Sequence, residues 1–406
     1  MAPLISIAIP TRERGRYLTY CLETTLRCDL RKVEIVVSDN ASADASFVDD
    51  PRFAAVKFVR QPSRIPIAAN YEAVFAACSG DYILYLGDDD AVMPSGIADL
   101  AEILEARRPD IVSWPEPQYF WPLGRQRGSL TIKRRHMRGG FINQDPREIM
   151  RLVCDGLRGN SAVHCGCLKR SIVENIRARC GRYFYHVNPD AAAYGALSLA
   201  QTYFYLSRPV TMYGRSPASH TTALASHNSV EQIRWRDENA KEIKPHNLDI
   251  QSRAVAADAL DGLLTTFQLL DLKEPPIDVA SWKRRIAAEV ARMPEAERPW
   301  QLDLVNVWLG KIGQSPIALP AESGAVAVAQ AGRRRPSLSK VELAATPTFL
   351  ANAAEAADFV EFLVGPGTLV RREPWLAASV RWARLLLRAK LRSGRGMQAR
   401  REGAAS

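Results

Sequence analysis

The first quarter of the chain alternates short apolar runs with amphipathic stretches. Apolar runs rich in β-branched residues predict strands at 4–10, 33–40, 56–62, 82–87 and 110–116. Between these runs, apolar positions recur at helical spacing and predict helices at 16–28, 68–78 and 94–107. Strands that alternate with helices indicate βαβ units, and near-continuous apolar strands indicate a sheet covered on both faces. The pattern therefore predicts an α/β fold with a mostly parallel sheet flanked by helices.

The pattern changes along the rest of the chain. Residues 117–145 are aromatic and basic and predict strands or a hairpin, whereas residues 146–178 predict helix. Residues 183–214 predict a loop, a helix from Pro189 and a strand that ends near Tyr213. Segments rich in alanine, leucine and arginine then predict helices at 249–272, 279–292, 300–312 and 348–364. We therefore expect a domain at 1–225, with halves 1–115 and 116–225, and an α-helical C-terminal region at 226–406.

Three polar segments follow predicted strands of the N-terminal sheet. "PTRERGR" follows the first strand, "SDNASAD" the second and "GDDD" the fourth. Open sheets of this kind bind ligands beyond the carboxyl ends of their strands. Any one of these segments alone would be interpreted as a solvated turn. Because all three converge on one edge of the sheet, they predict a binding site there.

The fourth strand runs directly into three consecutive carboxylates, Asp88, Asp89 and Asp90. Repulsion among them costs free energy unless a cation lies nearby. An acidic cap for the following helix needs only one or two of them. Mg²⁺ and Mn²⁺ prefer carboxylate oxygens, take one or two from the protein and complete their shell with water and substrate phosphates. The run therefore favours a divalent cation that bridges the protein to a phosphate.

The stretches "ISIAIPTRERGRYL", "EIVVSDNASAD" and "IAANYEAVFAACSGDYILYLGDDDAVMP" together resemble the family 2 glycosyltransferases of GT-A fold. The resemblance covers roughly residues 4–215 and is most specific before residue 95. It implies a Rossmann-like GT-A domain that transfers a sugar from a nucleoside diphosphate sugar, with a UDP-sugar as the expected donor. It also implies a Mn²⁺ or Mg²⁺ cofactor, inversion at the anomeric carbon, and a glycan or lipid-linked glycan acceptor in surface polysaccharide synthesis.

The resemblance assigns roles to individual residues of the N-terminal half. Asp89 would coordinate the metal, with Asp90 in the same shell. The family often has an asparagine where this chain has Glu13, and this difference affects how the base is recognised. Asp39 would accept a hydrogen bond from the base, and Asp88 would lie by the ribose. The residues expected to bind the nucleotide sugar in this half are Pro10, Thr11, Arg14, Asp39, Arg64, Asn70 and Asp88.

The resemblance also implies a general base, because the acceptor hydroxyl must lose its proton. Asp190 follows Pro189 at the start of a predicted helix, in a context that related transferases share. The segment "GRSPASHTT" matches a loop that folds over the diphosphate in related enzymes. There Arg215 and Ser216 would bind phosphate, and His220 would complete the metal shell.

The charge of the chain suits an anionic partner, since the formal net charge is +10. Residues 375–401 carry a stripe of arginines beside an apolar face, and a basic amphipathic helix is expected at 375–392. Such a helix lies on an anionic membrane surface or packs on the catalytic domain, and both interpretations stay open. The sequence has no recognisable signal peptide and no run of about 18 apolar residues. We therefore expect the chain to be cytoplasmic, and we further expect it to associate peripherally with the inner face of the membrane.

Other classes of protein fit the residues less well. A nucleotidyltransferase would need a glycine-rich loop after the first strand, and "PTRERGR" has a single glycine. A non-catalytic nucleotide-sugar-binding or membrane-tethering protein of the same fold would not need Asp39, Asp88, Asp89 and Asp190 together. Nucleic acid is not expected as a partner, because the loops of the predicted site carry carboxylates. The scattered cysteines predict no disulfide framework, and His164 and His186 are interpreted as structural.

Overall fold

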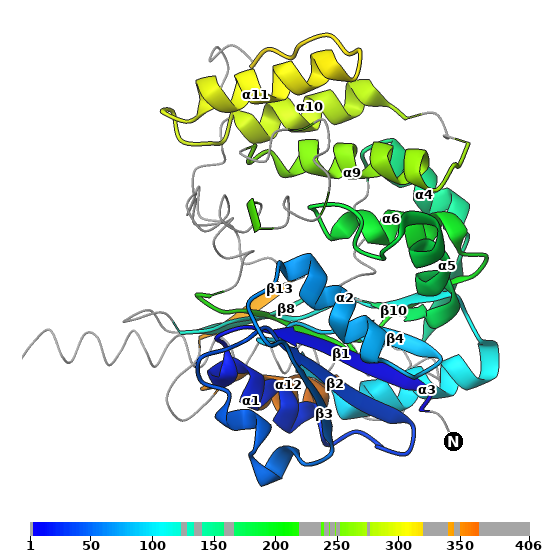
Figure 1. Cartoon of the computed structure of the whole chain (residues 1–406), viewed down its shortest axis with the longest axis vertical. Coiled ribbons are helices and arrows are strands. Elements are labelled where there is room, and N and C mark those ends of the chain that lie inside the picture. The colour runs from blue at the N-terminus through cyan, green and yellow to red at the C-terminus, as the bar shows by residue number, and fades with distance from the viewer. Residues whose placement is uncertain are drawn as a thin grey trace, which may run out of the picture.

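The computed structural model describes residues 3–122, 128–133, 140–157, 166–218, 237–238, 243, 248, 252–273, 277–319, 340–344 and 350–364. The sheets and their flanking helices form the lower part of the molecule in Figure 1. Helices α9 (Val255–Leu269), α10 (Val279–Val290) and α11 (Arg298–Lys311) stack above them, on the side that carries α6 (Asp190–Leu199). The predicted basic helix at 375–392 lies outside the described residues. Within the part of the chain that is described, no helix has both the length and the apolar character needed to cross a bilayer.

The N-terminal elements follow the predicted alternation. Strands β3, β2, β1 and β4 pair in that order, all in parallel, with Ile5 of β1 between Val33 and Tyr82 of its two neighbours. Strands β1 and β2 are rich in apolar β-branched residues and are buried on both faces, whereas the edge strand β3 is largely accessible. The elements are β1 (Ile5–Thr11), α1 (Gly15–Thr25), β2 (Val33–Asp39), the 3-10 turns Ser46–Val48 and Pro51–Phe53, β3 (Val56–Arg60), α2 (Ile67–Ala77), β4 (Tyr82–Tyr85), α3 (Pro94–Arg107) and β6 (Ile111–Ser113).

Beyond β4 the sheet is mixed, which corrects the expectation of a mostly parallel sheet. Strand β10 (Gly166–Lys169) lies antiparallel between β4 and β6, then β11 (Tyr203–Leu206) runs parallel to β6 and β9 (Phe141–Gln144) forms the antiparallel edge. Helices α4 (Pro146–Cys154) and α5 (Arg170–Cys180) flank β10, within the range predicted as helical. A strand of four residues is too short to interrupt a helical periodicity visibly.

A second sheet lies against the acidic run and has the order β13-β8-β7-β12-β5. Its strands are β5 (Ala91–Val92), β7 (Gln118–Phe120), β8 (Ser129–Lys133), β12 (Thr211–Arg215) and β13 (Lys340–Ala344). Helix α12 (Ala353–Val364) packs on this sheet in an apolar cluster with Tyr119 and Met212. The chain therefore returns to the N-terminal part at 340–364, and the region expected to be helical also contributes a strand.

The predicted helices of the remaining chain are confirmed, with ends that shift by a few residues. They are α6 (Asp190–Leu199), α9 (Val255–Leu269), α10 (Val279–Val290) and α11 (Arg298–Lys311). Their apolar faces share one cluster with the main sheet, in which Ala8 and Tyr85 belong to the strands and Trp282 and Trp308 to α10 and α11. Trp282 and Trp308 are thus buried in an apolar core that is continuous with the sheet carrying the predicted site.

Candidate active site

A pocket of about 380 Å³ lies at the carboxyl ends of β1 and β4 and beside the start of α2. This is the edge at which the sequence predicts a site. Six of the predicted nucleotide-sugar residues line it: Pro10, Thr11, Arg14, Arg64, Asn70 and Asp88. Asn40, Tyr71 and Ala218 also line the pocket and were not predicted.

Asp88 is held by groups from two other elements. The Thr11 hydroxyl donates to its Oδ2 at 2.8 Å, and Arg14 Nη1 donates to its Oδ1 at 2.9 Å. Burial raises the pKa of Asp88, and the Arg14 guanidinium lowers it in part. A second nitrogen of Arg14 donates to the carbonyl of Ala218. Thr11, Arg14 and Asp88 therefore form one hydrogen-bonded unit across the floor of the pocket.

Asp39 and Asn70 make their hydrogen bonds within the protein. The Asp39 carboxylate is fully buried, accepts the Ser42 hydroxyl at 2.5 Å and is not among the pocket-lining residues. The Asn70 amide accepts from the Ser38 hydroxyl at 2.7 Å and donates to the Ser38 carbonyl at 3.2 Å, so it ties α2 to the end of β2. The structure therefore does not bring Asp39 to the pocket, because the loop after β2 folds back onto its carboxylate.

Arg64 lies at the mouth of the pocket and pairs with Glu238. Glu238 also accepts from Arg12 Nη1 at 2.9 Å, so one carboxylate joins two pocket arginines. No local pattern predicts this contact, because 174 residues separate Arg64 from Glu238.

Asp89 and Asp90 are buried against β12. Asp89 Oδ2 accepts the Ser216 amide at 3.0 Å. Asp90 Oδ1 accepts the Gly214 amide at 2.6 Å, and its Oδ2 accepts the Gly87 amide at 2.8 Å. Burial raises the pKa of Asp90 well above its usual value, and the charges of Asp89 and Glu116 raise it further. The predicted segment 214–216 therefore does meet the acidic run, but it does so through backbone amides.

The side chains of that segment do not both face a phosphate site. The Arg215 guanidinium lies over the rings of Phe120 and Tyr213, at 5.3 Å and 5.7 Å from their centroids. The Ser216 hydroxyl is buried and has no hydrogen-bond partner among the described residues. His220, the predicted third metal ligand, lies outside the described residues.

The acidic run carries an excess of negative charge. Asp88, Asp89 and Asp90 are each at most 5% exposed, and the described cation that pairs directly with them is Arg14. Among the described residues, no group of three or more histidines, cysteines or carboxylates is arranged to hold a metal. A divalent cation that shares its shell with substrate phosphates needs only one or two protein carboxylates and would offset the excess. The residues present are compatible with such a cation, and Asp89 is the candidate ligand, because both oxygens of Asp90 already accept backbone amides.

The backbone of Asp190 forms the first residue of α6, as predicted, and its side chain lies outside what the structure describes. The loop before it touches the pocket wall. The ring of Phe184 packs edge-on against Tyr71 at 5.0 Å, and Tyr71 packs against Tyr85 at 5.1 Å. The chain that leads into Asp190 therefore lies behind the two tyrosines that line the pocket.

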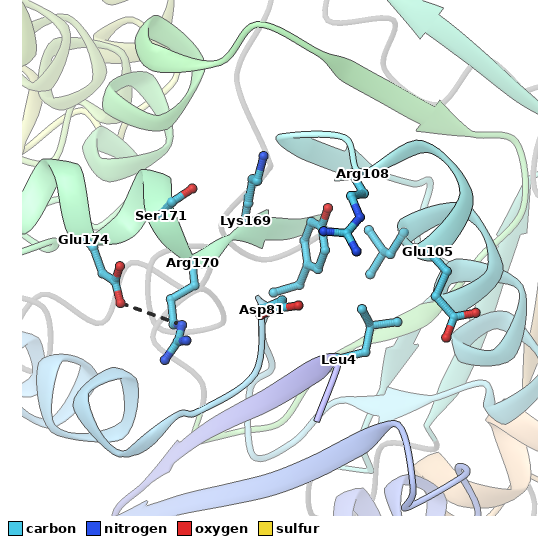
Figure 2. Close-up of a pocket in the computed structure, with 10 residues that line it drawn as sticks. Leu4, Asp81, Glu105, Arg108, Lys169, Arg170, Ser171 and Glu174 are labelled. Carbon is cyan, nitrogen blue, oxygen red and sulfur yellow. Dashed lines mark ion pairs between the residues drawn. The ribbon is translucent and has the colours of Figure 1, made fainter. Parts of the chain in front are cut away.

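A second pocket, of about 330 Å³, lies at the opposite edge of the sheet, where β1 and β4 begin (Figure 2). Arg170 and Glu174, one turn apart on α5, form an ion pair at one side of it at 3.7 Å. Its charged lining consists of three cations and three carboxylates, namely Arg108, Lys169, Arg170, Asp81, Glu105 and Glu174. Because these charges balance, the pocket does not favour a phosphate, and the site remains at the carboxyl edge.

Comparison with known proteins assigns the N-terminal part of the chain to a family. Residues 6–177 match the family model described as glycosyl transferase family 2. These residues form a glycosyl transferase family 2 domain. The matched range holds β1 to β4, the acidic run and most of the pocket, and the predictions of a family 2 glycosyltransferase and of a GT-A fold are confirmed.

Two curated relatives align with parts of the chain. Glycosyltransferase GlyG of Streptococcus pneumoniae serotype 4 (strain ATCC BAA-334 / TIGR4) is 27% identical over 119 residues, which are 28% of this chain and 38% of that protein. Chondroitin synthase of Escherichia coli is 29% identical over 102 residues, 23% of this chain and 14% of that protein. The chain thus spans less than half of the length of either relative.

Among solved structures, the crystal structure of S. aureus TarS 1-349 in complex with UDP-GlcNAc aligns with 77% of this chain and 92% of its own, with a TM-score of 0.45 and 13% identity. A likeness this weak supports no statement about the site.

Proposed function

We propose that this chain is a glycosyltransferase that moves a sugar from a nucleoside diphosphate sugar to an acceptor hydroxyl. The observation that carries the proposal is the unit of Thr11, Arg14 and Asp88 at the floor of the pocket, inside the segment that matches the family. The activity of the whole chain is a proposal because the curated relatives align over 38% and 14% of their lengths.

The proposed donor is a nucleoside diphosphate sugar, with a UDP-sugar as the first candidate. Arg12, Arg14 and Arg64 line it and present guanidinium groups, which suit the oxygens of a diphosphate. In this proposal Asp88 would accept a hydrogen bond from a ribose hydroxyl. On binding, a diphosphate would compete with Glu238 for Arg12 and Arg64.

Asp89 would hold a Mn²⁺ or Mg²⁺ ion together with the donor phosphates. When bound, this ion supplies positive charge to the departing diphosphate. Asp190 would remove the proton of the acceptor hydroxyl, which then attacks the anomeric carbon in one displacement and inverts its configuration. The acceptor that we propose is a glycan or a lipid-linked glycan.

Calorimetric titration tests the donor site. UDP, GDP and dTDP are titrated into the purified chain with and without Mn²⁺, and the titrations are repeated with Asp89→Ala. We expect one diphosphate, UDP, to bind in a Mn²⁺-dependent way, and Asp89→Ala to weaken this binding at least tenfold. Asp81→Ala is the matched control, because it removes a carboxylate at the other end of the same strand, and it should leave the affinity unchanged. A folded protein that binds none of the three diphosphates would overturn the proposal.

A further inference from the structure

A buried polar network ties the loop before Asp190 to the C-terminal helices. His186 and Asp261 are each 2% exposed, and the imidazole Nε2 lies 3.2 Å from Asp261 Oδ2. The other carboxylate oxygen of Asp261 accepts the indole N–H of Trp308 at 2.9 Å. Asp261 of α9 thus receives two donors, one from the loop before α6 and one from α11.

The geometry fixes the tautomer of His186. Its Nδ1 accepts the backbone N–H of Asn188 at 2.9 Å, so this nitrogen carries no proton. The neutral ring must then carry its proton on Nε2 and donate it to Asp261. The carboxylate of Asp261 therefore determines which nitrogen of His186 can hold the backbone of Asn188, two residues before Asp190.

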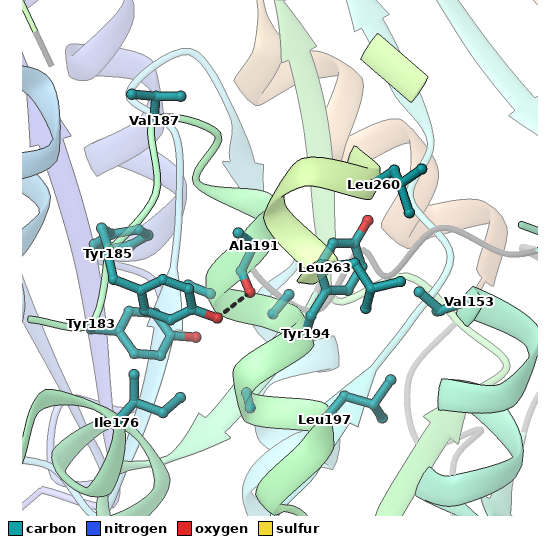
Figure 3. Packing of buried hydrophobic residues seen from close by; sticks show 14 of the residues in the cluster. Val153, Ile176, Tyr183, Tyr185, Val187, Ala191, Tyr194, Leu197, Leu260 and Leu263 are labelled. Carbon is teal, nitrogen blue, oxygen red and sulfur yellow. Dashed lines mark hydrogen bonds between the residues drawn. The ribbon is translucent and has the colours of Figure 1, made fainter. Parts of the chain in front are cut away.

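Further contacts hold the other side of the same turn. Tyr185 Oη donates to the carbonyl of Ala191 at 2.7 Å and lies 2.8 Å from the hydroxyl of Thr266 on α9, and Figure 3 shows Tyr185 pointing at Ala191. A Cβ on Gly262 would lie 2.9 Å from the Cβ of Ala191, so a glycine at this position allows α9 to approach the start of α6 closely. Asp190 is therefore bracketed by Asn188 and Ala191, and both contact groups that α9 supports directly or through His186.

We propose that Asp261 is a positioning residue that acts through His186 to fix the loop carrying Asp190, so that the C-terminal helices take part in the acceptor step. This inference rests on the proposed function, in which Asp190 is the base. A packed apolar set of similar volume would stabilise this interface without the cost of burying a carboxylate. The polar network instead specifies one orientation of the turn, on the side where Phe184 meets the pocket wall.

Asp261→Asn tests the network with no change of shape. The amide keeps one acceptor oxygen for two donors, so either His186 or Trp308 loses its partner. We use donor hydrolysis as the readout, with UDP-glucose, UDP-galactose, UDP-N-acetylglucosamine and GDP-mannose as probes and water as the acceptor. We expect kcat for nucleotide release to fall tenfold to a hundredfold, because misplacing a base by about 1 Å costs up to this factor. The Kd of UDP should stay within twofold of the wild type.

Trp308→Phe is the matched control. It removes the other hydrogen bond of Asp261 and leaves the His186 bond in place, so it should lower stability while kcat stays within threefold of the wild type. His186→Asn retains an acceptor near Nδ1 but cannot reach Asp261, and it should behave like Asp261→Asn. The positioning role would be overturned if folded Asp261→Asn kept the wild-type kcat. It would also be overturned if Trp308→Phe lost as much kcat as Asp261→Asn does.

A second measurement does not depend on turnover. Exchange of the Asn188 amide proton should be at least tenfold faster in Asp261→Asn than in the wild type, while the amide of Val37 in β2 keeps its protection. Equal protection of Asn188 in both proteins would also overturn the inference. A wild type that binds and hydrolyses no donor would count against the proposed function, whereas the exchange experiment would still decide whether Asp261 holds the loop.

Discussion

Neighbouring carboxylates of the acidic run have different surroundings, although they follow one another in the chain. Asp88 pairs with Arg14 and lines the pocket, so its charge is compensated and available to a ligand. Asp90 faces two backbone amides and no described cation pairs with it. Burial and the charges of Asp89 and Glu116 disfavour its ionised form and raise its pKa, and the two amides offset this rise only in part. This difference separates a ligand-binding carboxylate from one that holds β12 in place.

The raised pKa of Asp90 predicts a pH-dependent stability. Between the ordinary value of 3.8 and the folded-state pKa, the native state binds a proton that the unfolded state has lost. The stabilising contribution of this group is thus complete below about pH 4 and is lost as the pH rises through the folded-state pKa. We expect the wild type to lose unfolding free energy relative to Asp90→Asn as the pH rises from 4 to 8 without metal. Urea unfolding at several pH values measures it, and a constant difference between the two proteins would contradict the prediction.

At the scale of elements, local patterns in the sequence were informative and distant partners were not. Strands β1, β2 and β4 are apolar runs followed by polar loops, so their positions and the edge they share could be predicted. Strand β10 was hidden because four residues between two helices leave no period of their own. Strand β13 and the contacts of Glu238 and Asp261 depend on residues far away in the chain, and no local pattern encodes them. The predicted roles of Asp39 and Arg215 were assigned by motif, which fixes the position of a residue but not the direction of its side chain.

Strand β12 requires a glycine where it crosses the acidic run. A Cβ built on Gly214 would lie 1.7 Å from the carbonyl oxygen of Asp89, so no other residue fits unless the backbone moves. Such a shift would also weaken the amide bonds that Gly214 and Ser216 donate to Asp90 and Asp89. We expect Gly214→Ala to lower the unfolding free energy by about 3 kcal/mol, as overpacking does, and to weaken nucleotide binding.

Gly310 offers the matched control for this substitution. It lies within α11, and a Cβ there would meet nothing within 4 Å. Alanine is favoured over glycine in a helix by up to about 1 kcal/mol, so Gly310→Ala should be neutral or stabilising. Guanidinium denaturation compares the two variants, and similar losses in both would show that close approach is not what Gly214 provides.

For the molecule as a whole, the main sheet and the C-terminal helices share one apolar interior. The same cluster contains Ile83 of β4, Ala191 of α6, and Trp282 and Trp308 of the C-terminal helices. Strand β13 and helix α12 close a second cluster against residues of the N-terminal part. A division at residue 225 was predicted from composition, yet apolar contacts cross it in both clusters. Two regions that share a core are expected to unfold together.

Trp282→Ala tests this cooperativity. The indole is 1% exposed and donates to the Cys154 carbonyl at 3.0 Å, so its removal leaves a cavity and breaks one buried hydrogen bond. We expect a loss of about 3–5 kcal/mol. If the two regions form one unit, the transitions followed by far-ultraviolet circular dichroism and by tryptophan fluorescence should coincide in the wild type and shift together in the variant. If residues 1–225 and 226–406 were independent, the variant would show two unfolding transitions. Only the transition of the C-terminal helices would then shift relative to the wild type. The C-terminal helices could then be removed without unfolding the pocket, and the link from Asp261 to Asp190 would lose its physical basis.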